Sequence, residues 1–418
     1  MTVGSNWDWE PGKKPVVELR ACSRKYQWQE EAAAGPDGEV LAVSVHLEDG
    51  RTGIVVNGEL WEATFEKAWY LRFSPDGRLT ALVSDEGEWT LAVDGEMWPE
   101  GFAFAWDTRF SRAGDRIAAA VQQDMTYAMA VDGRPWENYF INASNFTLSS
   151  SGEATAAVVQ VAPLDQADIE TFQKGVFSVA VDGRAWDMTF VNAWTPVFDP
   201  SGRRVAAQVR TSLYDYTIAV DGRTWPSTYA GVWEPAFNPA TGEAAAPVRV
   251  GGAWGMALDG RIIWDPVFKQ CWQQQFSPDG QKLWAIAAPR HGRFTAAVDG
   301  RPWKTSFAVV TDLVLSPDGR RAACLAQEDG EWLTAVDDGV WPGRFDMAYR
   351  PVFSPDGGRL AVKVERQGRF TIVLDGKPYR EDFDLVWDPV FSPDGDKVLI
   401  RAVDQGRYYR LVASAADF

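Results

Sequence analysis

The sequence contains few of the residues that most metal, haem and catalytic sites need. In 418 residues there are two histidines, His46 and His291, and three cysteines, Cys22, Cys271 and Cys324. Haem c attachment needs a Cys-x-x-Cys-His motif and iron–sulfur clusters need grouped cysteines, and the sequence has neither. Two histidines are too few for most His-ligated metal sites and leave little scope for a Ser–His–Asp triad. We therefore expect no cofactor, no metal and no catalytic residue. We expect His46 to be structural, His291 to be solvated in a hairpin tip, and the cysteines to be buried apolar residues.

Positive charge and long apolar segments are also scarce. Lysine and arginine total 41 against 58 acidic residues, a formal charge of −17, which argues against nucleic acid and anionic membrane surfaces as partners. A basic partner fits better. No apolar run is long enough to span a bilayer, and the start, MTVGSNWDWEPGKKP, lacks a cationic region followed by an apolar one. These absences predict a cytoplasmic protein, and 46% hydrophobic residues predict a globular one.

A turn motif, FSPDG or a close relative, recurs along the whole chain. Successive copies are 37 to 40 residues apart, except for one interval of 50. A second turn motif, AVDG or a relative, lies about midway between copies of the first. The final glycines of the first motif are Gly38, Gly77, Gly114, Gly152, Gly202, Gly242, Gly280, Gly319, Gly357 and Gly395.

Each repeat has the turn signals of a four-stranded antiparallel meander. Pro-Asp-Gly marks one reversal, a polar tip such as EDGEW a second, and Asp-Gly a third. Four short strands every 38 or so residues predict an all-β protein, a β-propeller with ten blades. Two five-bladed propellers are the alternative. We expect a tail at 1–15, the propeller at 16–413 with an insertion at 163–174, and a second tail at 414–418.

The last repeat has three strands, and the N-terminal segment KPVVELRAC has no blade of its own. The N-terminal strand is therefore expected to complete the last blade and to remove two exposed sheet edges.

Aromatic residues recur at intervals of four between the blades, as in Phe190, Trp194 and Phe198. Because large aromatics repeated in every blade are usually core, the last aromatic of each connection is expected to fill the wedge between neighbouring blades. A role in ligand binding or electron transfer is the alternative. These residues are Trp69, Trp106, Trp194, Trp233, Trp272, Tyr349 and Trp387.

Several repeats, such as FSPDGRLTALV (73–83) and FSPDGDKVLIR (391–401), resemble the WD-repeat-like, TolB-type propeller repeat. That resemblance specifies a fold and leaves the function open. The Gly-His pair of true WD repeats is absent, and copies such as FSRAG (110–114) lose Pro or Asp.

The 21 tryptophans, the acidic charge and the element AVDGRPW (130–136, 297–303) also make the chain similar to the tryptophan-rich subunit of the Tmc transmembrane redox complex of sulfate-reducing bacteria. This resemblance implies a non-catalytic interaction subunit on the cytoplasmic side of a membrane electron-transfer complex. The implied partners are an iron–sulfur subunit, a cytochrome b and a multihaem cytochrome c. The chain would then be peripheral on the inner face of the cytoplasmic membrane.

Two departures from the repeat are candidate partner contacts. In the insertion, Asp165 could cap a short helix that carries Ile169 and Phe172 on one side. Near the N-terminus, Trp7 and Trp9 precede the closing strand, where an exposed pair must dock on the protein itself or on a partner. A tolerated surface loop and docking on the protein itself are the respective alternatives.

Two other functions remain open from the sequence. A propeller with many aromatics could bind a small ligand or a glycan. A hydrolase could use a pair of carboxylates, but the motif aspartates are repeated for turn geometry and single out no pair.

Overall fold

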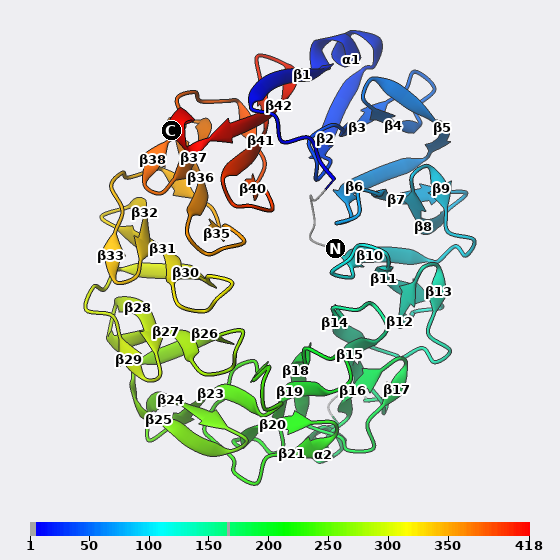
Figure 1. Ribbon diagram of the computed structural model, residues 1–418. Helices are drawn as coiled ribbons and strands as arrows, with labels where there is room; N and C mark the ends of the chain where they lie inside the picture. Colours follow the sequence, from blue (N-terminus) through cyan, green and yellow to red (C-terminus); the bar gives the residue numbers. More distant parts are fainter. Residues whose placement is uncertain (1–5, 165–167) are drawn as a thin grey trace. The chain divides into compact units, whose positions relative to one another are not determined.

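The computed structural model describes residues 6–164 and 168–418, which fold as an all-β propeller with ten blades of antiparallel sheet (Figure 1). The predicted fold class and blade count are confirmed. The blades are numbered here in chain order, starting from β2. The described residues group into two compact units of five blades each: one lies within residues 102–307, and the other within residues 6–101 and 308–418.

The central unit contains blades 3 to 7 and the short helix of the insertion. Its elements are β10 (Phe104–Phe110), β11 (Ile117–Gln123), β12 (Thr126–Val131) and β13 (Arg134–Pro135) in blade 3; β14 (Ala143–Leu148), β15 (Thr155–Gln160), α2 (Ile169–Lys174), β16 (Phe177–Val181) and β17 (Arg184–Ala185) in blade 4; β18 (Asn192–Phe198), β19 (Val205–Arg210), β20 (Tyr216–Val220) and β21 (Arg223–Thr224) in blade 5; β22 (Ala236–Phe237), β23 (Ala244–Val250), β24 (Ala253–Leu258) and β25 (Arg261–Phe268) in blade 6; and β26 (Gln270–Phe276), β27 (Leu283–Arg290), β28 (Arg293–Val298) and β29 (Arg301–Pro302) in blade 7.

The terminal unit contains blades 8 to 10 together with blades 1 and 2. Its elements are β2 (Trp28–Ala34), β3 (Leu41–His46), β4 (Thr52–Val56) and β5 (Glu59–Phe65) in blade 1; β6 (Lys67–Phe73), β7 (Leu79–Asp85), β8 (Glu88–Val93) and β9 (Glu96–Met97) in blade 2; β30 (Val309–Leu315), β31 (Ala322–Glu328), β32 (Glu331–Val336) and β33 (Gly339–Val340) in blade 8; β34 (Met347–Ala348), β35 (Val352–Phe353), β36 (Leu360–Arg366), β37 (Arg369–Leu374) and β38 (Lys377–Pro378) in blade 9; and β39 (Leu385–Val386), β40 (Val390–Phe391), β41 (Lys397–Asp404), β42 (Arg407–Ser414) and β1 (Gly12–Glu18) in blade 10, with helix α1 (Leu19–Lys25) and a 3₁₀ turn (Ala415–Asp417).

The N-terminal strand completes the last blade, as predicted. β1 pairs antiparallel with β42, which makes β1 the outer strand of blade 10. Val17 of β1 packs with Tyr408 of β42 in a cluster that also holds Leu41 of blade 1. β1 begins at Gly12, whereas the tail was expected to extend to residue 15. Helix α1, between this strand and blade 1, was not anticipated.

The wedges between blades are filled by small residues and by the first and middle aromatics of each connection. Between blades 5 and 6, for example, Trp225 and Tyr229 pack with Ala244, Ala246 and Val248. The middle aromatics Phe65, Phe102, Phe190 and Phe383 are among the largest fully buried side chains. Alanine-rich second strands allow such bulky rings to fit between closely packed sheets.

The last aromatic of each connection, expected in the wedge, packs instead across its own blade. Trp233 stacks on Trp254 of the third strand with ring centroids 5.6 Å apart, and Trp69 lies 5.4 Å from Trp89. Trp69 and Trp233 are 48% and 43% exposed, which contradicts the expected wedge-filling role for these two residues. The other pairs of this kind are Trp106–Tyr127, Trp194–Tyr216, Trp272–Phe294, Tyr349–Phe370 and Trp387–Tyr408.

The chain geometry explains this difference. Successive residues of a strand point to opposite faces, and the residue before the last aromatic is the buried one, as Ala68 before Trp69 and Cys271 before Trp272. The spacing of four therefore does not place the aromatics on one face, because the chain passes from the outer strand of one blade to the inner strand of the next. Two of these residues do contact a neighbouring blade. Trp106 contacts Phe146 of blade 4, and Trp387 packs against the cluster between blades 10 and 1.

Candidate functional site

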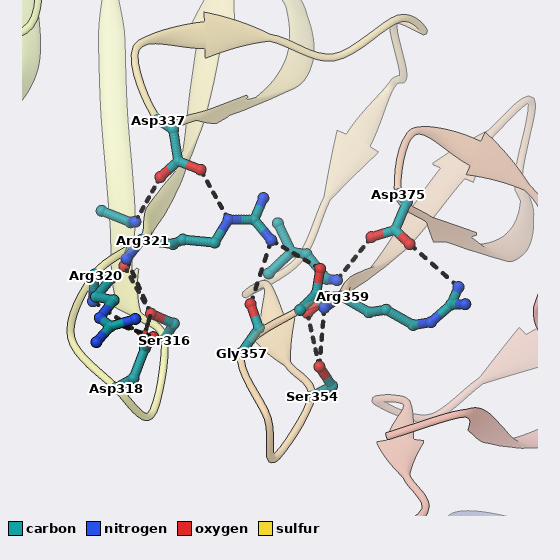
Figure 2. A network of polar contacts seen from close by, with 12 residues as sticks. Ser316, Asp318, Arg320, Arg321, Asp337, Ser354, Gly357, Arg359 and Asp375 are labelled. Carbon is teal, nitrogen blue, oxygen red and sulfur yellow. Dashed lines mark hydrogen bonds and ion pairs between the residues drawn. The ribbon is translucent and has the colours of Figure 1, made fainter. Parts of the chain in front are cut away.

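The aspartates of the two turn motifs have structural partners. Asp337 accepts a hydrogen bond from the Ala322 N–H at 2.9 Å and one from Arg321 Nε at 2.8 Å, and Arg321 also donates to the Gly358 carbonyl of the next blade at 2.9 Å (Figure 2). The same bond from a backbone N–H to the aspartate recurs in blade 9, between Leu360 and Asp375. These carboxylates hold turns and join blades, in agreement with the turn role expected for them.

The first motif is held in a similar way. Asp318 accepts from the Ser316 hydroxyl at 2.5 Å and from the Arg320 N–H at 3.0 Å (Figure 2). These two hydrogen bonds hold the pKa of Asp318 below its usual value, so it stays ionised at neutral pH. Asp279, Asp356 and Asp394 occupy the same position and have lowered pKa values for the same reason.

Other chemistry-bearing residues in the described part of the chain form no catalytic arrangement. Cys271 and Cys324 are buried, and burial raises the pKa of each thiol to about 12, so both stay protonated. The side chain of Cys22 lies outside the described part. In residues 6–164 and 168–418 no group of three or more His, Cys, Asp or Glu side chains is placed to hold a metal ion.

Two pockets on the terminal unit are lined by charged side chains, some of which are ion-paired within the protein. One, of about 430 Å³, lies between α1 and the tip of the β41–β42 hairpin, where Arg407 pairs with Glu18 at 2.6 Å. The other, of about 520 Å³, lies beside the β7–β8 hairpin, where Asp85 pairs with Arg51 at 2.9 Å. Part of the charge in each pocket therefore belongs to an ion pair within the protein.

The hairpin between the second and third strands of each blade ends in a tip, and most tips are polar and contain glycine. Blades 1, 2 and 6 to 10 each have a glycine with positive φ in a short tip, and in blade 4 the longer insertion also contains one, Gly175, at the end of α2. Six of the short tips are two-residue turns, in which glycine releases the strain of the left-handed region. The short tips are Glu48–Gly50, Glu86–Gly87, Gly251–Gly252, His291–Gly292, Asp329–Gly330, Gln367–Gly368 and Gln405–Gly406.

Three consecutive blades of the central unit, blades 3 to 5, depart from this pattern. In blade 3, Met125 replaces the glycine, keeps a positive φ of 60° and is 83% exposed. In blade 5, residues 211–215 form a longer loop in which Tyr214 is 80% exposed and Leu213 is exposed as well. In blade 4, the insertion carries α2, whose Ile169 is 64% exposed. Each of these tips presents apolar side chains to solvent.

The tips of blades 3 and 4 are linked through the connection between these two blades. Tyr127, two residues after Met125, forms a β-bridge with Phe140, which precedes the exposed Ile141. Asn142 then accepts a hydrogen bond from the N–H of Gln160, which precedes the exposed Val161. We call Met125, Ile141, Val161, Ile169, Leu213 and Tyr214 the tip surface.

Phe172, one of the residues predicted to contact a partner, instead packs the insertion against blade 5. Asp168 caps α2 by accepting from the Thr171 N–H at 3.0 Å, and hydrogen bonding from the side chain and the N–H of Thr171 lowers the pKa of Asp168. Phe172 lies under the guanidinium of Arg210, 5.7 Å from ring centroid to Cζ. The predicted helix is therefore present, with Ile169 facing solvent and Phe172 turned towards the protein. Asp165 lies outside the described residues, and the cap is Asp168.

The N-terminal tryptophans dock on the last blade. The rings of Trp7 and Trp9 stack with centroids 6.1 Å apart, and both side chains are half-buried. Lys397 donates to the Trp9 carbonyl at 3.0 Å, and Arg410 donates to the Asp8 carbonyl. This placement favours the alternative of docking on the protein itself. A contact of Trp7 and Trp9 with a partner stays a prediction.

Comparisons with known proteins give the chain no family. No protein-family model matches the sequence, and no curated protein matches it. Among solved structures, it is similar to a eukaryotic initiation factor, with 12% identity, a TM-score of 0.43, and coverage of 87% of this chain and 90% of that one.

Two propeller structures are also similar. For the β-propeller domain of Myceliophteria thermophila Cps50 (Swd1) the identity is 14% and the TM-score 0.31, with coverage of 73% of this chain and 95% of that one. For the Dos1 propeller the identity is 9% and the TM-score 0.36, with coverage of 96% and 94%. Likeness at this level carries no functional argument, and neither a TolB-type nor a Tmc relationship is supported by it. In the described residues no helix is long and apolar enough to cross a membrane.

Proposed function

We propose that the protein is a non-catalytic interaction module that binds a partner protein through the tip surface of blades 3 to 5. The observation that carries this proposal is the replacement of polar, glycine-containing tips by exposed apolar side chains in three consecutive blades. Contiguous exposed apolar groups in a soluble protein mark interaction sites. Large flexible or aromatic side chains such as methionine and tyrosine are common anchors of protein interfaces.

The backbone at Met125 strengthens this proposal. A non-glycine residue in the left-handed region costs about 1 kcal/mol relative to glycine, which most of the other blades use at the equivalent turn position. The side chain of Met125 is almost fully exposed, so packing within the protein does not compensate for this cost. A contact made only in a complex accounts for a methionine at this position.

The finer proposal concerns the kind of complex. The resemblance of the tryptophan-rich repeat suggests a membrane electron-transfer complex with an iron–sulfur subunit, a cytochrome b and a multihaem cytochrome c, with this chain on the cytoplasmic side. A chain that holds no redox centre would then act as a structural or regulatory subunit.

The test is purification of the tagged protein from its native host in mild detergent, side by side with the variant M125G/I169S/Y214S. We expect the wild-type protein to retain a stoichiometric partner that the variant loses, while both have the same thermal stability. Haem and iron–sulfur absorption in the wild-type eluate would support the redox complex. Equal recovery of the partner with both proteins would contradict the use of the tip surface.

A glycan or small ligand is the second candidate, and exposed Trp69 and Trp233 are the residues that favour it. If the wild-type protein is recovered colourless and without partners, binding of glycans to variants of these two tryptophans becomes the next measurement.

A further inference from the structure

Each apolar tip of blades 3 to 5 has an exposed carboxylate beside its exposed apolar side chain. Asp124 precedes Met125, Glu170 follows Ile169, and Asp215 follows Tyr214. In the described part of the chain, none of these three carboxylates forms an ion pair with lysine or arginine.

Carboxylates near several other tips are compensated. Asp85, at the base of the blade 2 tip, pairs with Arg51 at 2.9 Å. Asp404, at the base of the blade 10 tip, pairs with Arg369 at 2.9 Å. Other tips of the described chain also carry exposed carboxylates without an ion pair, such as Glu86 in blade 2 and Asp329 in blade 8. The tip surface differs from those tips in placing such carboxylates beside exposed apolar side chains.

The cations close to the tip surface leave this charge largely uncompensated. Arg210 stacks on Phe172, and Lys174 is exposed at the end of α2. Asp215 accepts a hydrogen bond from the Ser212 hydroxyl at 2.5 Å, which orients the carboxylate and leaves its charge in place. A chain with a formal charge of −17 adds a negative field of longer range.

From this pairing of apolar and acidic groups we infer that the tip surface takes a segment of a partner protein in which apolar side chains alternate with lysine or arginine. The inference rests on the proposed function and specifies the chemistry of its partner. The apolar side chains would cover Met125, Ile169 and Tyr214, while the cations would lie over the adjoining carboxylates. An anionic lipid surface is disfavoured because it would be repelled by the same carboxylates.

Complementary charge at the rim of an interface mainly raises the association rate, and its effect falls with salt. Surface charge pairs are individually weak, so neutralising all three carboxylates is expected to weaken binding by about tenfold. Removing the apolar anchors is expected to weaken it by about a hundredfold.

The probes are two synthetic 16-residue peptides that share the same leucine positions, one with lysine and one with glutamate at all other positions. Fluorescence anisotropy measures their binding to the wild-type protein, to the charge variant D124N/E170Q/D215N and to the apolar variant M125G/I169S/Y214S. A matched control, E86Q/D329N, removes exposed carboxylates from the tips of blades 2 and 8.

We expect the lysine peptide to bind the wild-type protein at least tenfold more tightly than the glutamate peptide. The charge variant and 0.5 M salt should each remove most of this preference, and the control variant should retain it. Equal binding of the two peptides, or no binding of the lysine peptide above the level of the apolar variant, would overturn the inference.

Other outcomes separate the inference from the proposed function. If the apolar variant loses the native partner while the charge variant binds it as the wild-type protein does, the proposed function stands and the inference fails. If both variants retain the native partner, both fail. Sedimentation of the wild-type protein with phosphatidylglycerol vesicles, abolished in the apolar variant, would overturn the inference in favour of a lipid surface.

Discussion

The hairpin tips of blades 3 to 5 and those of the other seven blades occupy the same place in the same repeating unit, yet they differ in chemistry. Seven tips are short and contain glycine, six of them with a polar residue and one, Gly251–Gly252, beside the partly exposed Val250. The other three expose Met125, Ile169 and Tyr214. Folding requirements are shared by all blades, so they explain the common pattern and leave the difference unexplained. In a repeat protein, equivalent positions in the other repeats provide the comparison. A position that departs from the repeat without a packing reason is therefore a candidate for function.

The Asp-Gly turns between the third and fourth strands, at the other end of the blades from the tips, keep the same structural role in blade after blade. There, an aspartate accepts the N–H of a residue in the second strand, as Asp299 does for Leu283 and Asp94 for Leu79. These bonds recur because each blade needs the same turn. The exposed apolar side chains of the tip surface are not explained by a turn requirement of this kind.

The largest expected effect is on stability and comes from a residue beneath the tips. Phe190, the middle aromatic of the connection between blades 4 and 5, is 1% exposed, and the variant F190A should lose about 3–5 kcal/mol of unfolding free energy. Chemical denaturation measures this loss. The variant M125G/I169S/Y214S should change the same quantity by about 1 kcal/mol or less. A loss as large as that of F190A would mean that the tips serve folding.

Removal of the insertion should have the next largest effect, on binding. A chain with residues 163–174 replaced by a Gly-Gly turn should bind the native partner at least tenfold more weakly, because Ile169 is lost from the tip surface. Its stability should fall by about 1 kcal/mol or less, since the contact between Phe172 and Arg210 is a partly exposed cation–π pair. Calorimetry on the purified complex measures the affinity. Unchanged affinity would show that the insertion is a tolerated surface loop.

Exchanging glycine and methionine between two tips should give opposite effects of about 1 kcal/mol. In M125G the strain of a positive φ is relieved, so stability should stay equal or rise while partner binding weakens. Gly330 of blade 8 has a φ of 85° and open space around it, so G330M should lose about 1 kcal/mol from backbone strain. Thermal unfolding of both variants checks the signs. A stability loss in M125G would show that Met125 supports the fold.

The smallest expected effect is the pH dependence of the insertion. The hydrogen bond from Thr171 lowers the pKa of Asp168 below its usual 3.8, so the stabilisation is fully present above pH 3.8 and is lost as the pH falls through the lowered value. Partner binding should therefore show no contribution from Asp168 between pH 7 and 5. The variant D168A, compared with the wild-type protein by hydrogen exchange at α2, should fray the helix at neutral pH because alanine cannot accept the Thr171 N–H. Identical exchange would contradict the capping role.

Much of the fold could be predicted from the repeat because turn residues report backbone geometry directly. The glycines after Pro-Asp and Val-Asp locate the reversals, and the missing strand of the last repeat predicts the pairing of β1 with β42. The exposure of Trp69 could not be predicted this way. It depends on the passage from the outer strand of one blade to the inner strand of the next, which breaks the rule that residues four apart share a face.

Of the six residues of the tip surface, the sequence indicated Ile169, because the insertion interrupts the repeat length. Met125 and Tyr214 leave the length nearly unchanged, and only an alignment of the tips QQDMTY and TSLYDY with EDGEW and RQGRF would have shown the missing glycines. Phe172 could not be assigned correctly, since its contact with Arg210 depends on how the insertion folds back onto blade 5.

The most direct test of the central claim is hydrogen exchange by mass spectrometry on the protein alone and in the complex isolated from its host. We expect slower exchange in the complex at segments 122–127, 139–143, 160–164, 168–177 and 210–216, with no change at the tips around Gly87, Gly292 and Gly330. Protection confined to those polar tips or to the Asp-Gly turns, with segments 122–127 and 210–216 unchanged, would contradict the central claim.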